Sequence, residues 1–257
     1  MRGNQIKNVL ETLFPIDTAE SWDNVGLQLG SFNKTIDSIL VSLDITLDVA
    51  LEAEKLNVDL IIVHHPLIFS PLKQINVDSE VGKIIEILLK NNISLYVAHT
   101  NFDVSTFGMG TILSKMINLN NPSVLQFTDE HLGLGSIGTI KPMLLSEYAA
   151  KIKDIFHLDV VSLIGNPNDE IKTVAILGGS GSSLIHTAKE KGADLYISGD
   201  ITYHHALEAK SIGLNVLDIG HHIEHDAFVT IKDVLVNQGI NCNILVSTTN
   251  TNPYKKI

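Results

Sequence analysis

The stretch Asp59-Leu-Ile-Ile-Val-His-His-Pro66 is the most informative part of the sequence for the fold class. Its apolar run indicates a strand, and the strand ends directly on a pair of histidines. A short, β-branched apolar run of this kind is typical of a central strand buried on both faces. A helix over 47–56, which Thr46 can cap, precedes the strand, and a second helix over 81–90 follows it. This alternation predicts a parallel sheet with helices packed against it.

Outside this stretch the pattern continues and then recurs. Further strands are predicted over 38–43 and 94–98, and an opening helix over 4–14. A shift of 135 residues aligns Ile36–Ile68 with Ile171–Tyr203 in the same order of strand, turn, helix and strand. We therefore expect an α/β protein with two similar α/β lobes, each a mostly parallel sheet with packed helices, produced by an internal duplication. The expected lobes are residues 1–130 and 131–257, closely docked because no low-complexity linker separates them.

Composition excludes several classes of protein. The chain has 257 residues, is 44% hydrophobic and carries a formal net charge of -11. Its apolar runs are too short to span a bilayer, and the acidic balance makes nucleic acid an unfavourable partner. We expect no signal peptide, because residues 1–5 are not followed by a long apolar stretch. Cys242 has no second cysteine with which to form an intrachain disulfide. We therefore expect a cytoplasmic protein with no membrane partner.

Metal-ligand side chains follow three predicted strands. His64 and His65 follow the strand at 59–63, Asp103 follows the one at 94–98, and His221 and Glu224 follow a strand over 215–219. Functional groups in open α/β sheets gather at the carboxyl ends of the strands. Imidazole and carboxylate together suit zinc, iron or manganese.

These five candidates exceed what one ion needs, so a pair of divalent ions is the natural expectation. Adjacent histidines on an extended chain point in different directions and more easily serve two ions, while Glu224 could bridge both. Glu224 lies three residues after His221 at the start of a helix predicted over 223–236, which places both on one face. Alternatives remain among nearby side chains. They are His225, Asp226 and the pair His204-His205.

Other polar and glycine-rich positions have two possible roles. Asp44 and Asp200 could orient ligands or simply cap helices. The runs 133–138 and 178–181 could cradle phosphate, although neither matches a P-loop and tight turns explain such runs more often. Trp22 suits either a core position or a substrate platform.

The chain resembles a known family, the dimetal-binding proteins named GTP cyclohydrolase 1 type 2 homologues. Six motifs, spread over nearly the whole chain, follow the family's order. They are Trp22-Asp-Asn-Val-Gly-Leu-Gln28, Val63-His-His-Pro66, Ala98-His-Thr-Asn-Phe-Asp103, Ser198-Gly-Asp-Ile-Thr-Tyr-His204, Asp218-Ile-Gly-His-His-Ile-Glu224 and Asn252-Pro-Tyr254.

The resemblance implies a dinuclear site whose ligands are His64, His65, Asp103, His221 and Glu224. It also implies a ring-shaped homohexamer with the metals facing an internal cavity. Many relatives carry an extra domain between the halves, and this chain is too short to hold it.

The chain departs from the family pattern at three positions. Ser136 stands where the family's central glycine-rich motif usually has arginine, and His205 and His222 also differ from many relatives. These departures leave the metal ligands in place. They weaken the expectation of nucleotide binding, because serine at 136 removes an anchor for phosphate.

Two functions fit these features. The first is a metal-dependent hydrolase, of cyclohydrolase or phosphoesterase type, in which His99 or His204 moves protons to or from an unidentified small-molecule substrate. The second is a non-catalytic metal-binding scaffold, chaperone or regulator.

Overall fold

The computed structural model describes residues 1–255 and divides the chain into two compact units. The first unit contains residues 1–102 and 228–255, and the second contains residues 103–227. The chain passes between them within two short helices, α4 (Thr100–Val104) and α9 (Glu224–Phe228).

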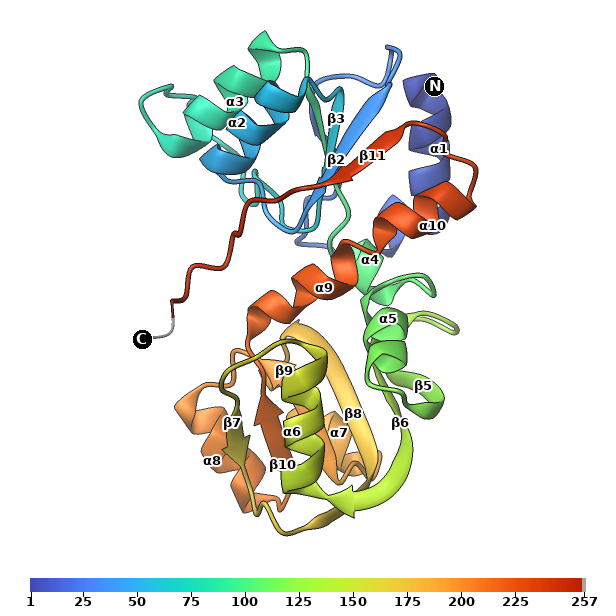
Figure 1. Cartoon of the computed structure of the whole chain (residues 1–257), viewed down its shortest axis with the longest axis vertical. Helices are drawn as coiled ribbons and strands as arrows, with labels where there is room; N and C mark the ends of the chain where they lie inside the picture. Colours follow the sequence, from blue (N-terminus) through green and yellow to red (C-terminus); the bar gives the residue numbers. More distant parts are fainter. Residues whose placement is uncertain (256–257) are drawn as a thin grey trace. The chain divides into compact units, whose positions relative to one another are not determined.

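The first unit is built on a five-stranded sheet of order β1-β4-β3-β2-β11. Its strands β3, β2 and β11 are labelled in Figure 1. Its strands β2, β3, β4 and β11 are parallel, and only β1 runs antiparallel to its neighbour. The strands are β1 (Gly26–Leu29), β2 (Ser38–Ser42), β3 (Leu60–Val63), β4 (Ser94–Val97) and β11 (Asn243–Val246). The helices are α1 (Gly3–Leu13), the 3-10 turn η1 (Ile16–Thr18), α2 (Leu47–Leu56), α3 (Glu80–Lys90) and α10 (Ile231–Asn237).

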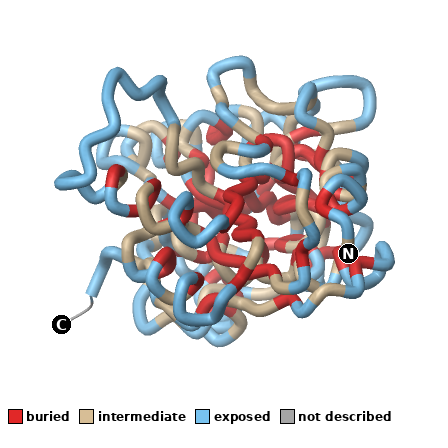
Figure 2. The backbone as a smooth tube through the Cα atoms, turned by 90° about the horizontal axis from the view of Figure 1, so that it is seen from above, coloured by how far each residue is buried: buried red, intermediate tan, exposed pale blue. Residues whose placement is uncertain are grey.

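Helices cover both faces of this sheet, with α2 and α3 on one face and α1 and α10 on the other (Figure 1). Every residue of β3 and β4 is buried, which explains their uninterrupted apolar sequence. One core cluster joins Val49 and Ala53 of α2 and Leu88 of α3 to Ile61 and Val97 in the sheet. In Figure 2 the buried stretches of backbone, in red, lie mostly inside the exposed stretches, in pale blue.

The second unit contains a six-stranded sheet of order β5-β6-β8-β9-β10-β7. Its strands are β5 (Asn120–Phe127), β6 (Gly133–Leu144), β7 (Ser162–Ile164), β8 (Glu170–Ser180), β9 (Leu195–Gly199) and β10 (Asn215–Asp218). Its helices are α5 (Met109–Met116), α6 (Leu145–Ile155), η2 (Ser182–Leu184), α7 (Ile185–Glu190), α8 (Tyr203–Ser211) and η3 (His221–Ile223).

The predicted α/β fold with two sheets and packed helices is confirmed, but the second sheet is mixed. Only β8, β9 and β10 are parallel, while β5, β6 and β7 pair antiparallel. A long hairpin of β5 and β6 extends the parallel centre on one side, and such additions are common in α/β sheets. The division into lobes at residue 130 stays a prediction.

The predicted repeat is visible in the hydrogen bonds of both units. Asp59 accepts hydrogen bonds from the backbone N–H groups of Asp37 and Ser38, at 2.8 and 3.1 Å. Shifted by 135 residues, Asp194 accepts the same two bonds from Lys172 and Thr173, at 2.9 and 2.7 Å. In each unit the carboxylate just before one parallel strand, β3 or β9, therefore ties it to the neighbouring strand, β2 or β8, which supports an internal duplication.

The glycine run at 133–138 lies within strand β6, where a turn was one expectation. A Cβ at Gly133 would lie 2.1 Å from the carbonyl oxygen of Gln126, and one at Gly138 would lie 2.9 Å from that of Asn120. These glycines let the two strands of the hairpin approach closely, so they are packing positions.

The single helix predicted over 223–236 is wrong, because the structure forms η3, α9 and α10 in its place. The interruption at Val229 and Thr230 follows the point where the chain passes from one unit to the other. Two β-branched residues weaken the helix there, and tertiary packing overrides the local pattern. Among the described residues, no helix has the length and apolar character needed to cross a bilayer.

Glu52 on α2 anchors the chain that leaves β11. Its Oε1 accepts hydrogen bonds from the backbone N–H and the hydroxyl of Thr248, at 2.8 and 2.7 Å. Its Oε2 accepts from the hydroxyls of Ser247 and Thr249, the latter at 2.9 Å. Burial alone would raise the pKa of Glu52, but these bonds outweigh it and lower the pKa to about 2.

We expect Glu52→Gln to lower the free energy of unfolding by about 1–2 kcal/mol at neutral pH, because it removes a charged acceptor of several hydrogen bonds. A lowered folded-state pKa stabilises the fold above the ordinary value of 4.5, and this contribution disappears as the pH falls toward about 2. Urea unfolding should therefore show a constant difference between the wild type and Glu52→Gln above pH 5 that shrinks below pH 4.5.

Glu54→Gln is the matched control, because it removes an exposed charge from the same helix. A difference between the wild type and Glu52→Gln that stays the same from neutral pH to pH 3 would contradict the assignment.

Candidate metal centre

His64 and His65 stand at the carboxyl end of β3, where the end of β2 fixes their backbone. The N–H groups of both residues donate to the carbonyl oxygen of Leu43, each at 3.0 Å. The pair is therefore held at the sheet edge by main-chain bonds that do not depend on either ring.

The ring of His64 is buried, with 1% of the residue exposed. Its Nδ1 lies 2.8 Å from the carbonyl oxygen of Ala98. A carbonyl only accepts, so Nδ1 carries the proton and the lone pair sits on Nε2, the atom suited to a metal. The rings of Phe102 and Phe228 pack against it, with centroids 5.8 and 5.2 Å away, and limit its rotation.

His65 is oriented by a carboxylate. Its Nδ1 lies 2.6 Å from Oδ1 of Asp44, which follows the end of β2. A hydrogen bond from the far ring nitrogen to a carboxylate fixes the tautomer of a metal-binding histidine and raises its basicity. Asp44 is therefore an orienting acid, which settles the choice between the two roles open to it.

His99 follows β4 and is oriented in the same way by Asp23. Its Nδ1 lies 2.9 Å from Oδ1 of Asp23, while Oδ2 accepts from the backbone N–H of Thr100 at 3.1 Å and from its hydroxyl. The Asp23 side chain is completely covered. Burial would raise its pKa, but the bonds from His99 and Thr100 outweigh that effect and lower the pKa to about 2.

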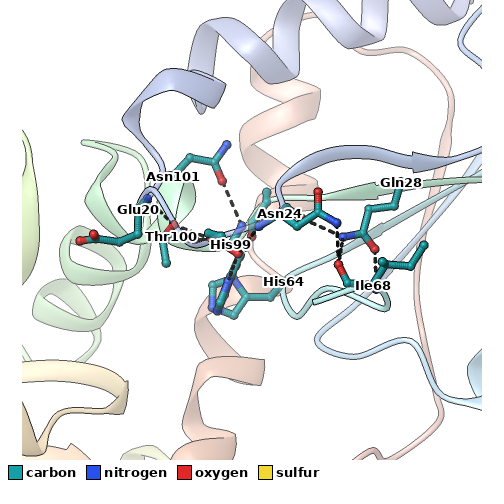
Figure 3. A network of polar contacts seen from close by, with 10 residues as sticks. Glu20, Asn24, Gln28, His64, Ile68, His99, Thr100 and Asn101 are labelled. Atoms are coloured by element: carbon teal, nitrogen blue, oxygen red, sulfur yellow. Dashed lines mark hydrogen bonds and ion pairs between the residues drawn. The ribbon is translucent and has the colours of Figure 1, made fainter. Parts of the chain in front are cut away.

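The backbone around His99 is also fixed (Figure 3). Asn101 accepts from the N–H of His99 at 3.0 Å and donates to the carbonyl of Phe14 at 2.8 Å. On the other side of the network, Asn24 and Gln28 both donate to the carbonyl of Ile68, at 2.6 and 3.0 Å. These bonds hold the loop that follows the His64–His65 pair.

The three imidazoles of the first unit form a group that could hold a metal ion. One ring nitrogen from each of His64, His65 and His99 lies within 4.8 Å of the other two. His99, which the sequence places among the catalytic candidates, thus lies beside two predicted ligands. Imidazoles with Nδ1 bonded to an acceptor fit a transition metal at Nε2.

The second unit has its own group of carboxylates with one imidazole. Nε2 of His221 lies 3.1 Å from Oε2 of Glu224, and its Nδ1 lies 2.7 Å from Oδ2 of Asp200. One oxygen of Asp103 and one of Glu224 lie within 4.8 Å of each other. Glu224 is buried, with 4% of the residue exposed. Carboxylate and imidazole donors this close together, one of them buried, suit a divalent cation.

The glycines at the end of β8 make room for Glu224. Gly179 has φ +63°, and a Cβ built there would lie 2.3 Å from Oε1 of Glu224. A Cβ at Gly178 would lie 3.2 Å from Cγ of the same side chain. The glycines of the run 178–181 therefore leave space for the Glu224 carboxylate. This role differs from both expected roles, a phosphate cradle and a tight turn.

The remaining candidates lie apart from these groups. His204 is exposed at the start of α8, with its ring against Tyr203 at 5.6 Å. His225 stacks on His222 with centroids 5.4 Å apart and planes 8° from parallel. Among the described residues, no group of three close ligands includes His204, His205 or His225.

Ser136 is buried and donates to the carbonyl of Gly110 at 2.8 Å.

The sequence contained a signal for two of the orienting acids. Asp44 precedes His65 by 21 residues, and Asp200 precedes His221 by the same interval. In both cases the aspartate follows one strand and the histidine follows the next parallel strand. Asp23 had no such signal, because it reaches His99 across 76 residues from an irregular loop.

Comparison with known proteins identifies the relationship. Residues 1–253 match the family described as Duf34/NIF3 (NGG1p interacting factor 3). The chain is 37% identical to a Streptococcus pneumoniae protein named GTP cyclohydrolase 1 type 2 homolog, and the match covers all of both chains.

Two solved structures have the same fold. A Staphylococcus aureus hypothetical protein is 32% identical, with a TM-score of 0.93 over 100% of this chain and 99% of its own. A Bacillus cereus protein related to NIF3 is 28% identical, with the same TM-score and the same coverage. The chain therefore belongs to the Duf34/NIF3 family.

Proposed function

We propose that this protein binds a pair of divalent metal ions through His64, His65, Asp103, His221 and Glu224 and is a metal-dependent hydrolase. The observation that carries the proposal is the repeated pairing of a histidine at a strand end with an orienting aspartate. His65 with Asp44 and His221 with Asp200 have this arrangement. Metal-binding histidines almost always donate their second ring N–H to a carboxylate, a backbone carbonyl or a water, and these two pairs have the carboxylate form of that arrangement.

The ligand set suits zinc, iron or manganese, because it combines imidazole with carboxylate and contains no thiolate. Glu224 is the proposed bridge, since its two oxygens can serve two ions. When bound, such a pair of ions supplies an activated water and polarises the bond under attack.

His99 is the proposed proton carrier. Asp23 holds Nδ1 of His99, so Nε2 is the atom that exchanges a proton with substrate or water. His204 is a second candidate for this role, exposed at the start of α8. Trp22, with its ring 6.1 Å from that of His99 and more than half exposed, is a candidate to line the substrate's path.

The proposal includes a homohexamer, the cytoplasm as its compartment and a small-molecule substrate. The curated relative's name suggests a cyclohydrolase, and phosphoesters are the other class that a pair of metal ions commonly hydrolyses. The family resemblance implies an arginine at the position of Ser136, so a nucleotide phosphate would need a different anchor in this chain.

Purification without added metal, followed by elemental analysis and assays against GTP and a panel of phosphoesters, tests the proposal. We expect about two ions per chain, with a turnover that chelation abolishes and reloading restores. His99→Gln should lower the rate by roughly 10²–10⁴-fold at unchanged metal content, whereas the exposed His131→Gln should change neither. In light scattering of the same sample, a hexamer of 28.1 kDa chains would weigh about 169 kDa.

Each outcome separates one part of the proposal from the others. Absence of bound metal would refute the site itself. Full metal content without turnover on any substrate would favour the non-catalytic scaffold, chaperone or regulator. Loss of metal in His99→Gln would make His99 a ligand in place of a proton carrier.

A further inference from the structure

Residues 247–251, which follow β11, are linked by hydrogen bonds to a proposed metal ligand. Glu52 holds residues 247–249 through the four hydrogen bonds described above. Two residues further on, the hydroxyl of Thr251 donates to Oδ2 of Asp44. The other oxygen of Asp44 lies 2.6 Å from Nδ1 of His65. A chain of hydrogen bonds thus runs from Thr251 through Asp44 to the His65 ring.

A second arrangement of the same kind occurs in the first unit. Asp23 also divides its two oxygens between a histidine and a threonine, with His99 at Oδ1 and Thr100 at Oδ2. In both cases the threonine hydroxyl donates to the oxygen that the histidine does not use. The two threonines come from different parts of the chain, one beside its histidine and one near the C-terminus.

The physical effect of the threonine is on the rotation of the carboxylate. The χ2 torsion of an aspartate is broad and roughly two-fold, so one hydrogen bond leaves the carboxylate plane poorly fixed. A second bond, at the other oxygen, defines that plane and with it the direction of the imidazole. The anchor at Glu52 fixes the backbone of the segment, which keeps the Thr251 hydroxyl in place at little cost in entropy.

We propose that Thr251 is a positioning residue of the metal site, which aligns His65 through Asp44, and that residues 247–251 form a strap that holds it there. The proposal rests on the function proposed above, because it requires His65 to be a ligand. It assigns the C-terminal segment a role in metal binding although that segment contributes no ligand.

Thr251→Val tests the proposal, since it keeps the shape of the side chain and removes the hydroxyl. We expect the affinity for Co²⁺, measured on protein freed of metal with a chelator, to fall roughly tenfold. This is the lower end of the range observed when a residue that orients a metal ligand is mutated. The visible absorption spectrum of bound Co²⁺ should also change, because the ligand field depends on the direction of the His65 ring. Thr251→Ser restores the hydroxyl and should return both the affinity and the spectrum to the wild-type values.

Thr249→Val is the matched control, because it removes one of the four hydrogen bonds to Glu52 and leaves the other three, together with the bond from Thr251 to Asp44, in place. It should lower the melting temperature without changing the Co²⁺ affinity or spectrum. If Thr251→Val does not fold, Thr251→Ala gives the same comparison with a smaller side chain.

The possible failures are distinguishable. Wild-type affinity and spectrum in Thr251→Val, or in Thr251→Ala in its place, would overturn the positioning role and leave the metal site intact. A spectrum that changes equally in Thr249→Val would reduce the strap to a general stabiliser and also overturn the proposal. Absence of Co²⁺ binding in the wild type, or unchanged binding in His65→Ala, would refute the proposed function itself.

Discussion

Glu224→Gln is expected to lower the metal content from about two ions per chain to one or fewer, because a bridging ligand needs two oxygens and an amide offers one. His225→Gln should leave the metal content unchanged. The Glu224 carboxylate is buried and lies 3.1 Å from the His221 ring, whereas the His225 ring is stacked on His222. Elemental analysis of both variants, purified in parallel with the wild type, makes the measurement.

Equal loss of metal from both variants would contradict the bridging assignment. It would indicate that the short helix around these residues had been disturbed as a whole. Circular dichroism of the two variants would reveal that disturbance, and unchanged spectra would exclude it.

Gly179→Ala is expected to weaken metal binding by roughly 10–100-fold, because a Cβ at this position would lie 2.3 Å from Oε1 of Glu224. The carboxylate is the end of a flexible side chain and can move away at a modest cost in stability. That movement, however, would take an oxygen of Glu224 away from the position in which it is proposed to bind metal. The variant should therefore lose metal affinity far more than it loses stability.

Gly192→Ala is the matched control for the backbone. Gly192 has φ +78°, and no described atom lies within 4 Å of a Cβ built there. Both variants force alanine into the left-handed region at a cost of about 1–2 kcal/mol, so the comparison isolates the clash with Glu224. Both variants are freed of metal with a chelator, and their zinc affinities are measured by titration. Thermal unfolding of the same samples gives their stabilities. Equal affinities would show that the glycine is needed only for its backbone conformation.

Local patterns were sufficient for the elements of the parallel centre. The strand at β3 was predicted from four apolar residues, and α2 from a helical stretch preceded by a threonine cap, whose hydroxyl does accept from the N–H of Val49. These features were readable because each depends on neighbours in sequence, through burial on both faces or a hydrogen bond three residues away. The helix over 223–236 failed for the opposite reason, since it breaks beside the point where the chain changes unit.

The same distinction applies to the candidate site. Its ligand types follow strand ends, so sequence alone could propose His64, His65, Asp103, His221 and Glu224, and their joint role stays a prediction. The structure additionally brings His99 beside His64 and His65.

The sequence by itself determined where strands end and which side chains those ends carry, because strand burial and turn chemistry are local. Only the tertiary structure decided what orients those side chains. Asp23 reaches His99 across 76 residues, Thr251 reaches Asp44 across 207, and Gly179 on β8 makes room for Glu224 at the start of α9. Hydrogen bonds and close contacts of this kind depend on the order of strands in a sheet, and the register of distant segments is set by packing of the whole unit.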